Sequence, residues 1–310
     1  MKRAGFVAVI GAPNAGKSTL VNRLVGTKVT IVTQKVQTTR FPIRGLAIVG
    51  DTQLVLVDTP GIFEPRRRLD RAMVRAAWSG AHDADVVAHL IDVQPHVRSA
   101  EHCAQPADRR SLADDETILA GLKGSGRRAI LVLNKVDLIR PHQLLPLVRE
   151  LDGSGAYEDV LIISAATGAG VDELRTRLAA RMPAGEWLYP SEQHSDLHAR
   201  IFAAELTREK LFLRVHEELP YSCAVETTKF EEGADGSVRI EQTIFVEREG
   251  QRGILIGKGG ETLKWIGKAA RLELTASFAR PVHLFLHVKV NARWAEQPSY
   301  YRDVGLDPGA

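Results

Sequence analysis

A short stretch near the amino terminus combines glycines with a lysine and two hydroxyls, which are groups that can hold phosphates. Residues 11–19 read Gly-Ala-Pro-Asn-Ala-Gly-Lys-Ser-Thr and fit the pattern G-x-x-x-x-G-K-[ST]. The apolar run 5–10 predicts a buried strand before it, and apolar residues at helical spacing predict a helix after it. Such a loop points free backbone N–H groups at an anion. The alternative, an ordinary glycine turn, leaves these flanking elements unexplained.

Two side chains of this loop have separate predicted tasks. Lys17 would reach the β- and γ-phosphates of a nucleotide, and the Ser18 hydroxyl would bind Mg²⁺. The predicted nucleotide contacts here are Gly11, Asn14, Ala15, Gly16, Lys17, Ser18 and Thr19.

A second motif, Asp58-Thr59-Pro60-Gly61, follows the alternating run 53–57. That run and the run 43–49 are separated by Gly50-Asp51, which predicts a hairpin. At the end of a strand, Asp58 can hold Mg²⁺ through water, and Gly61 can offer its backbone N–H to a γ-phosphate.

The third motif, Asn134-Lys135-Val136-Asp137, follows the buried run 129–133 and selects the base. Asp137 can accept two hydrogen bonds from the N1 and 2-amino groups of guanine, a donor pair that adenine lacks. Asn134 would tie this loop to the phosphate loop, and the Lys135 stem would lie over the base. After the run 160–163, the backbone of Ser164, Ala165 and Ala166 could meet the guanine carbonyl. The predicted ligands are therefore GTP or GDP with Mg²⁺.

The elements that must position these motifs are strands of one open sheet, because ligands bind such sheets at the carboxyl ends of their strands. The order of motifs is that of a GTPase domain of the phosphate-loop superfamily, an α/β fold with a mostly parallel sheet flanked by helices, over roughly residues 4–182. The polar stretch 94–114, with two prolines, is predicted to be a surface excursion of unknown role. Arg66, Arg67 and Arg68 are read as a solvated loop without a role.

Resemblance to related GTPases suggests the catalytic residues. Lys17, Thr39 and Gly61 would stabilise the transferring phosphoryl group. The metal ligands would be Ser18, Asp58 and one threonine of the Thr38-Thr39 pair, of which Thr39 is favoured because in relatives the threonine before an arginine binds Mg²⁺. Ile62 stands where Ras-like proteins carry a glutamine that orients water, so slow intrinsic turnover is expected. Asn14 matches a position that helps hold K⁺ in several relatives. A role in loop geometry alone is the alternative, and both interpretations remain open.

Composition places the chain among globular proteins. It has 310 residues, 44% of them hydrophobic and 25% charged, which is enough for about two domains. No apolar run has the length of about 18 residues that a membrane span needs, and two distant cysteines give no disulfide framework or zinc site. Cytoplasm is the default location. The net charge is +6 over residues 1–182 and −3 over 183–310, yet +6 again over 248–293, which indicates a localised polyanion contact.

The carboxyl-terminal part predicts a second domain after a linker at 183–196. Predicted elements are a helix at 197–215, strands at 223–230 and 238–246, a helix that leads into a glycine loop at 257–260, a helix to 278 and a strand at 282–290. This is the order of a type II KH domain, whose G-x-x-G loop clamps about four nucleotides of RNA. The predicted RNA contacts are Gly257, Lys258, Gly259, Gly260, Lys264, Lys268 and Arg271. A small α/β domain with a glycine turn and a solvated basic face is the alternative.

The combination resembles the bacterial Era family over nearly the whole chain. Further matching segments are QTTR (37–40), REKL (208–211), ELPYS (218–222), VEREGQ (246–251) and PVHL (281–284). The resemblance implies a GTP-binding domain at 1–182, the linker at 183–196, and an RNA-binding domain with a tail at 197–310.

The family likeness also implies partners and a role. These are the 3′ end of small-subunit ribosomal RNA, the small ribosomal subunit, and assistance in its maturation, with GTP setting the affinity for RNA. Family members can associate with the inner membrane, so peripheral association is an open expectation, and a monomer is expected. Two hypotheses for the role of hydrolysis remain open. In the first, GTP hydrolysis is a timer and the KH domain delivers the protein to immature ribosomes. In the second, the protein is a GTP-dependent RNA-binding scaffold and its hydrolysis is incidental.

Overall fold

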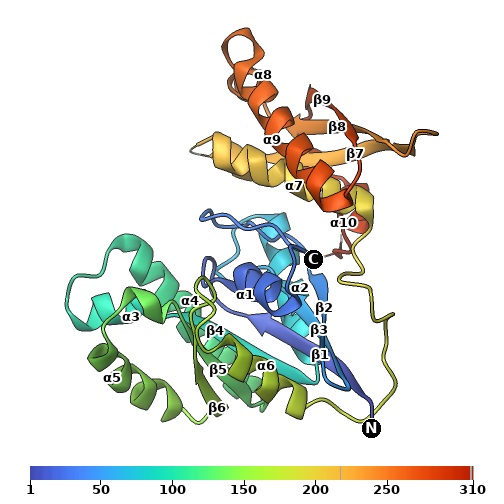
Figure 1. The fold of residues 1–310 in the computed structure, drawn as a ribbon. Coiled ribbons are helices and arrows are strands. Elements are labelled where there is room, and N and C mark those ends of the chain that lie inside the picture. The colour runs from blue at the N-terminus through green and yellow to red at the C-terminus, as the bar shows by residue number, and fades with distance from the viewer. Residues whose placement is uncertain (217, 308, 310) are drawn as a thin grey trace. The chain divides into compact units, whose positions relative to one another are not determined.

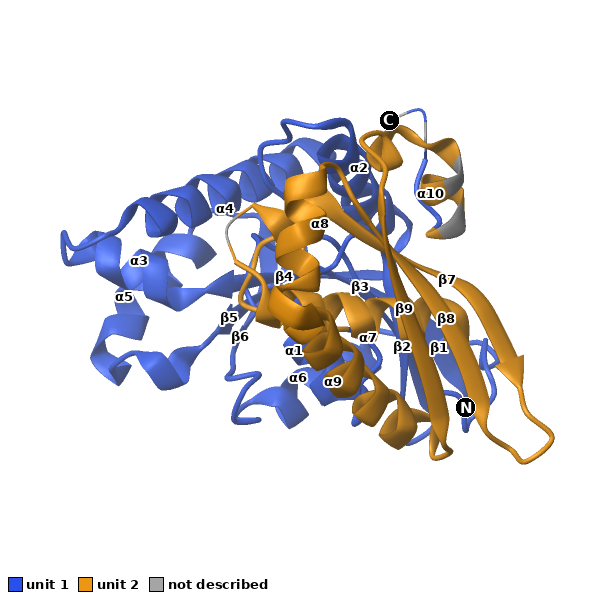
Figure 2. Cartoon of the chain, turned by 90° about the horizontal axis from the view of Figure 1, so that it is seen from above, with its two compact units in different colours: residues 1–30, 39–196, 305–310 blue, residues 31–38, 197–304 orange. Residues whose placement is uncertain are grey.

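The computed structural model describes residues 1–216, 218–307 and 309. Its internal contacts divide the chain into two compact units (Figure 2). The first unit contains residues 1–30, 39–196 and 305–310, and the second contains residues 31–38 and 197–304.

The first unit is an open sheet of six strands in the order β2-β3-β1-β4-β5-β6 (Figure 1). Only β2 and β3 pair antiparallel; the other neighbours are parallel. The strands are β1 (Arg3–Ile10), β2 (Ile43–Val49), β3 (Thr52–Asp58), β4 (Val86–Asp92), β5 (Ala129–Asn134) and β6 (Tyr157–Ile162). The helices are α1 (Lys17–Val25), α2 (Arg68–Asp83), α3 (Val93–Ala100), α4 (Pro106–Ser125), α5 (Pro141–Asp152) and α6 (Val171–Ala180). The predicted α/β GTPase fold is confirmed.

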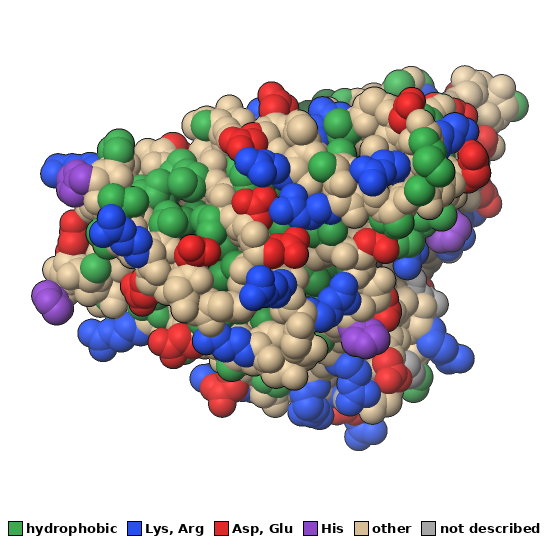
Figure 3. Space-filling view, turned by 90° about the horizontal axis from the view of Figure 1, so that it is seen from below, with side chains coloured by type: hydrophobic (Ala, Val, Ile, Leu, Met, Phe, Trp, Pro, Cys, Tyr) green, Lys and Arg blue, Asp and Glu red, His purple; other side chains and the backbone are tan. Residues whose placement is uncertain are grey.

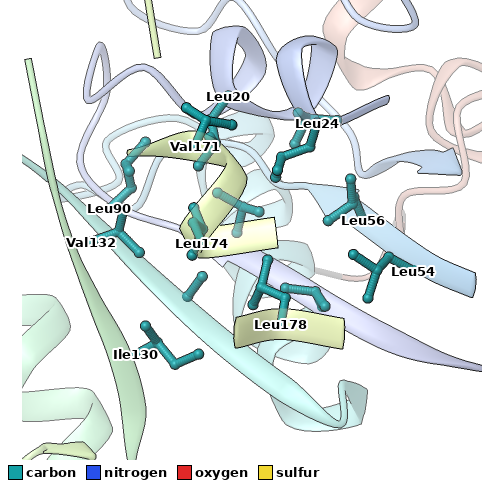
Figure 4. Close-up of a cluster of buried hydrophobic side chains, with 14 of the residues drawn as sticks. Leu20, Leu24, Leu54, Leu56, Leu90, Ile130, Val132, Val171, Leu174 and Leu178 are labelled. Carbon is teal, nitrogen blue, oxygen red and sulfur yellow. The ribbon is translucent and has the colours of Figure 1, made fainter. Parts of the chain in front are cut away.

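Helices bury both faces of this sheet, which explains why its strands are nearly continuous apolar runs. On one face, leucines of α1 and α6 pack on β3 and its neighbours. Leu24 of α1, Leu174 of α6 and Leu56 of β3 belong to this one buried cluster (Figure 4). On the other face, α2, α4 and α5 supply Ala77, Ile118, Leu147 and other side chains. This packing fixes the strand ends, and with them the loops that carry the motifs.

The stretch 94–114 is not the irregular surface excursion that its composition predicts. Most of it lies in α3 and α4, which are separated by a few residues. The prolines misled the prediction because Pro106 begins α4, a position where a helix needs no N–H donor. Arg68 is likewise the first residue of α2 rather than part of a loop.

The second unit has three strands in the order β7-β8-β9, with β7 and β8 antiparallel and β8 and β9 parallel. Its strands are β7 (Cys223–Glu232), β8 (Val238–Val246) and β9 (Val282–Val290). Its helices are α7 (Ala199–Arg214), α8 (Glu249–Ile256), α9 (Glu261–Phe278) and α10 (Pro298–Asp303). The order helix, strand, strand, helix, glycine loop, helix, strand is the one predicted for a type II KH domain.

Residues 31–38 belong with this second unit although they lie early in the chain. Ile31 is buried in a cluster with Ala203 and Leu206 of α7. The Val32 N–H donates to Glu209 at 2.9 Å, and Lys35 donates to backbone carbonyls at the end of α7. The sequence predicts only an irregular loop here.

Among the described residues, no helix is both long enough and apolar enough to span a bilayer. Within the described residues neither cysteine forms a disulfide: Cys103 is exposed, and Cys223 is buried with its thiol donating to the Leu219 carbonyl at 2.7 Å.

Candidate functional site

The phosphate loop leaves β1 at Ile10 and enters α1 at Lys17. Gly16 has φ +100°, and a Cβ there would collide with the amide of Asn134, so both conformation and space require glycine. Asn14 is also left-handed, with φ +64°, a conformation that asparagine tolerates better than most residues. The loop geometry is thus built into these residues.

Lys17 folds back over the loop. Its Nζ donates to the carbonyls of Gly11 at 3.0 Å and Ala12 at 2.8 Å, and its side chain is only 6% exposed. Burial lowers the pKa of Lys17 to about 8, although the Asp58 charge opposes this shift. A buried ammonium that has only carbonyl partners would gain strongly from phosphate oxygens.

Asp58 is the centre of an oxygen-rich cluster at the end of β3. Its Oδ2 accepts from Ser18 at 2.8 Å, from Thr30 at 2.8 Å and from Thr39 at 3.2 Å. The hydroxyls of Ser18 and Thr39 lie 2.9 Å apart. Burial raises the pKa of Asp58, while these hydrogen bonds and Lys17 oppose the rise.

These groups fit Mg²⁺. The Asp58 Oδ1 atom is buried without a hydrogen-bond partner among the described residues, so it would gain most from a cation. Hydroxyl and carboxylate oxygens are the hard ligands that Mg²⁺ takes, usually one or two carboxylates together with phosphates. The described residues hold no cluster of three His, Cys, Asp or Glu side chains able to bind a metal by itself.

The loop after β3 lies against the phosphate loop. A Cβ on Gly61 would come within 2.9 Å of Pro13, so only glycine permits this approach. The Ile62 N–H donates to the Gly11 carbonyl at 3.2 Å, and the Ile62 side chain is 1% exposed within the apolar core. Ile62 therefore cannot orient a water molecule by its chemistry or by its position.

The guanine loop is joined to the phosphate loop as the sequence predicts. Asn134 donates from Nδ2 to the Ala15 carbonyl at 2.8 Å, and its Oδ1 accepts from the Ala165 N–H at 2.9 Å. One amide thus fastens three loops together. Asp137 is exposed, so a bound base would be needed to bury its carboxylate. Ser164 is buried and Ala166 exposed beside Ala165.

Three supporting residues escaped the sequence analysis. Thr30 joins the Asp58 cluster, Asp92 pairs with Lys135 at 2.6 Å, and Arg23 donates to the backbone carbonyls of Ala165 and Ala166. Asp92 had a usable signal, since it follows the apolar run 86–91 just as Asp58 follows the run 53–57. Thr30 and Arg23 had none, because each acts across a tertiary contact.

The glycine loop of the second unit joins α8 to α9. Gly257, Gly259 and Gly260 all have positive φ, between +61° and +80°. Lys258 in the loop and Lys264, Lys268 and Arg271 on α9 are exposed, whereas Ile266, Ala270 and Leu274 on the same helix are buried. The Lys264 Nζ donates to the Gly259 carbonyl at 3.1 Å. The basic side chains therefore form one solvent-facing row that begins at the loop.

The fold and these two loops define a phosphate-loop GTPase joined to a KH domain. The sequence matches the 50S ribosome-binding GTPase family over residues 6–135 and the KH domain family over residues 218–295. It is 63% identical to GTPase Era of Caulobacter vibrioides over 305 residues, covering 98% of this chain and 96% of that protein. Identity to GTPase Era of Maricaulis maris is 56% over 306 residues, covering 99% and 98%.

Solved structures agree. A crystal structure of Era with MgGDPNP and nucleotides 1506–1542 of 16S ribosomal RNA matches with a TM-score of 0.87 and 38% identity, over 98% of this chain and 99% of that one. A crystal structure of an Aquifex aeolicus Era variant bound to GDP·AlF4⁻ matches with a TM-score of 0.86, 38% identity and the same coverage. The chain belongs to the GTPase Era family.

Proposed function

We propose that this GTPase is a molecular switch that binds the 3′ end of small-subunit ribosomal RNA and assists maturation of the small ribosomal subunit. The observation that carries the proposal is its likeness, over nearly the full chain, to an Era structure holding both MgGDPNP and a 16S RNA fragment. The oxygen cluster around Asp58 and the basic row beside the glycine loop supply matching chemistry in this chain.

Hydrolysis would rest on groups of the phosphate loop and of the loop after β3. Lys17 exchanges the carbonyls of Gly11 and Ala12 for β- and γ-phosphate oxygens, and Gly61 offers its N–H to the γ-phosphate. Ser18, Thr39 and Asp58 would hold Mg²⁺, which when bound would neutralise charge on the phosphates. Asp137 accepts from guanine, and the backbone of 164–166 meets its carbonyl. Because Ile62 lies in the core, intrinsic turnover is slow.

Potassium is a separate proposal. Asn14 is exposed at the rim of the phosphate loop, where its side-chain oxygen could help coordinate K⁺. Comparing kcat in KCl and NaCl at equal ionic strength tests this role. A several-fold higher rate in KCl that disappears in Asn14→Ala supports it, and equal rates remove it.

The RNA contacts are proposed to be the loop 257–260 with Lys258, and Lys264, Lys268 and Arg271 on α9. Lys258→Asp together with Gly259→Asp should weaken binding of a 16S 3′-terminal fragment by at least about tenfold, while GTP affinity stays unchanged. Lys229→Asp, at a half-exposed position of β7, is the control. Fluorescence anisotropy measures both affinities. Unchanged RNA affinity in the double variant would show that the glycine loop of the second unit does not bind RNA.

Release of the protein from small ribosomal subunits distinguishes the timer hypothesis from the scaffold hypothesis. If hydrolysis is the timer, protein loaded with a non-hydrolysable GTP analogue should stay on small subunits, whereas protein loaded with GTP should leave them. Sedimentation through a sucrose gradient measures retention. Equal retention with both nucleotides favours the scaffold with incidental hydrolysis.

The remaining expectations concern organisation and location. We place the GTP-binding domain at 1–182, the linker at 183–196 and the RNA-binding domain at 197–310. We further propose a cytoplasmic monomer that can associate peripherally with the inner membrane. Fractionation of cells and light scattering of the purified protein test these two statements.

A further inference from the structure

We propose a second RNA contact, on the GTPase unit, formed by Arg66, Arg67, Arg71 and Arg75 and called here the arginine face. Its ligand is the sugar-phosphate backbone of structured RNA, bound without sequence preference. The proposal rests on the proposed function, because it assumes that RNA is the polyanion that this protein meets.

The four arginines are exposed around the first turns of α2. Among the described residues, Arg66, Arg67 and Arg71 have no ion-pair partner. Arg75 pairs with Asp307 at 3.3 Å, but both side chains are about 60% exposed, so this pair contributes little. The guanidinium groups of Arg66, Arg67 and Arg71 can therefore meet an external anion directly, and that of Arg75 can do so by exchanging its exposed partner Asp307.

The acidic residue nearest to them in the sequence of α2 does not neutralise the face. Asp70 is 5% exposed, and its Oδ2 accepts from the backbone N–H groups of Arg66 at 3.1 Å and Arg67 at 2.9 Å. That carboxylate caps the helix and does not face outward. Glu64, in the loop that leads to Arg66, is exposed, and Asp114 accepts a hydrogen bond from its backbone. With Asp307 beside Arg75, three carboxylates accompany the four guanidinium groups, so the face keeps a net positive charge.

Local physics does not favour this arrangement. A helix N-terminus carries positive partial charge, so basic residues in its first turns are unfavourable there. Arg71 and Arg75 are also spaced i, i+4, where like charges repel. A bound polyanion would remove both penalties. The face of the protein shown in Figure 3, for comparison, mixes the two signs of charge.

The neighbourhood favours an RNA backbone over a membrane or a protein. No large hydrophobic side chain between Val36 and Leu138 is strongly exposed in this fully described part of the chain. A membrane-binding surface needs apolar groups to insert, and protein interfaces usually centre on buried apolar or aromatic anchors. Guanidinium groups match phosphate oxygens with two parallel hydrogen bonds. Contacts that go to phosphates alone carry no sequence information, so binding should be independent of sequence.

The position of the face links it to catalysis. Arg66 follows Gly61 and Ile62 closely in the chain, and Asp70 fastens the backbone of Arg66 and Arg67 to α2. RNA held on the arginine face would therefore hold the segment that leads from the γ-phosphate contact into α2.

The test uses the full chain with all four arginines replaced by glutamine. The matched control replaces four other exposed arginines of the same unit, Arg109, Arg110, Arg128 and Arg149, by glutamine, which changes the net charge equally. Two probes are compared: a short single strand from the 3′ end of 16S RNA, and the same strand extended by an RNA hairpin. GDP affinity and thermal unfolding verify that both variants fold.

For the extended probe, the arginine-face variant should bind at least about tenfold more weakly at low salt, and the slope of log affinity against log salt should fall by about two to four. The control variant should change far less, and the short strand should bind both variants as it binds the parent protein. Equal losses in the two variants, or tighter binding to anionic vesicles than to the extended RNA, would overturn the arginine face. If the Lys258→Asp, Gly259→Asp double variant bound the short strand with unchanged affinity, the proposed function would be overturned instead.

Discussion

The two glycine loops of this protein are built to meet phosphates in opposite ways. In the loop 11–16 the charged groups are inside: Lys17 is 6% exposed and Asp58 is fully buried. At the loop 257–260 the charged groups face solvent, on Lys258 and along α9. The phosphate loop thus has buried charges that would gain from phosphate or Mg²⁺, whereas the charges at the loop 257–260 are already solvated by water.

This difference predicts different sensitivities. Buried charges have shifted pKa values and are little screened by salt, so the nucleotide site should respond to pH more than to ionic strength. Exposed basic groups release counterions when RNA binds, so the KH surface should respond mainly to salt.

Removing the buried cation should have the largest effect. Lys17→Met should lower kcat for GTP by about 10²–10³-fold, because a preorganised charge in a buried site is lost. The same change should not destabilise the nucleotide-free protein, since it removes an ammonium that burial disfavours. Single-turnover hydrolysis and thermal unfolding measure the two effects. Lys123→Met, at an exposed position of α4, is the control, and a similar loss there would contradict the contrast.

Salt should separate the two loops next. If Lys258, Lys264, Lys268 and Arg271 each meet a phosphate, affinity for single-stranded RNA should fall about 20- to 50-fold between 50 and 200 mM salt. GTP affinity should change much less over the same range. Anisotropy titrations with labelled RNA and labelled nucleotide measure both. An equal dependence of the two affinities would show that burial does not distinguish the loops.

Glycine substitutions test how far the phosphate loop depends on its packing. Gly26→Ala places a side chain at φ +85° in open space and should cost about 1 kcal/mol. Gly16→Ala has the same left-handed penalty and also meets the Asn134 amide, so it should cost at least about 2 kcal/mol and weaken GTP binding. Urea unfolding compares the two. If both variants lose the same free energy of unfolding, the Asn134 side chain must move aside for the new methyl group at little cost.

The pH response should be the smallest effect. The folded pKa of Lys17, about 8, lies below its unfolded value of 10.5, so the unfolded chain binds more protons between these values. Stability of the nucleotide-free protein should therefore rise with pH across that window. Phosphates should raise this pKa again, so GTP binding at pH 8 should take up about half a proton. Calorimetry in buffers of different ionisation enthalpy measures the uptake, and proton release would contradict it.

The motifs could be predicted because each depends on residues adjacent in the chain. Lys17 follows Gly16 at the start of a helix, and Gly61 follows Asp58 at the end of a strand, so local periodicity was enough to place them. The strand and helix order of the second unit was likewise visible, as the residue limits of β8 and β9 show. The prediction was wrong where a helix begins with proline: because Pro106 was read as a turn signal, the start of α4 was predicted to be a loop.

The guanine nucleotide, the oxygens proposed to bind Mg²⁺ and the KH-like glycine loop could all be predicted from the amino-acid sequence, because short motifs encode these chemistries within a few adjacent residues. Only the tertiary structure decided that Thr30 joins Ser18 and Thr39 on Asp58, that Asp92 pairs with Lys135, and that residues 31–38 pack with α7. Partners in those contacts lie tens to more than a hundred residues apart. Such pairings depend on how strands and helices bury their apolar faces, and no local pattern records the result.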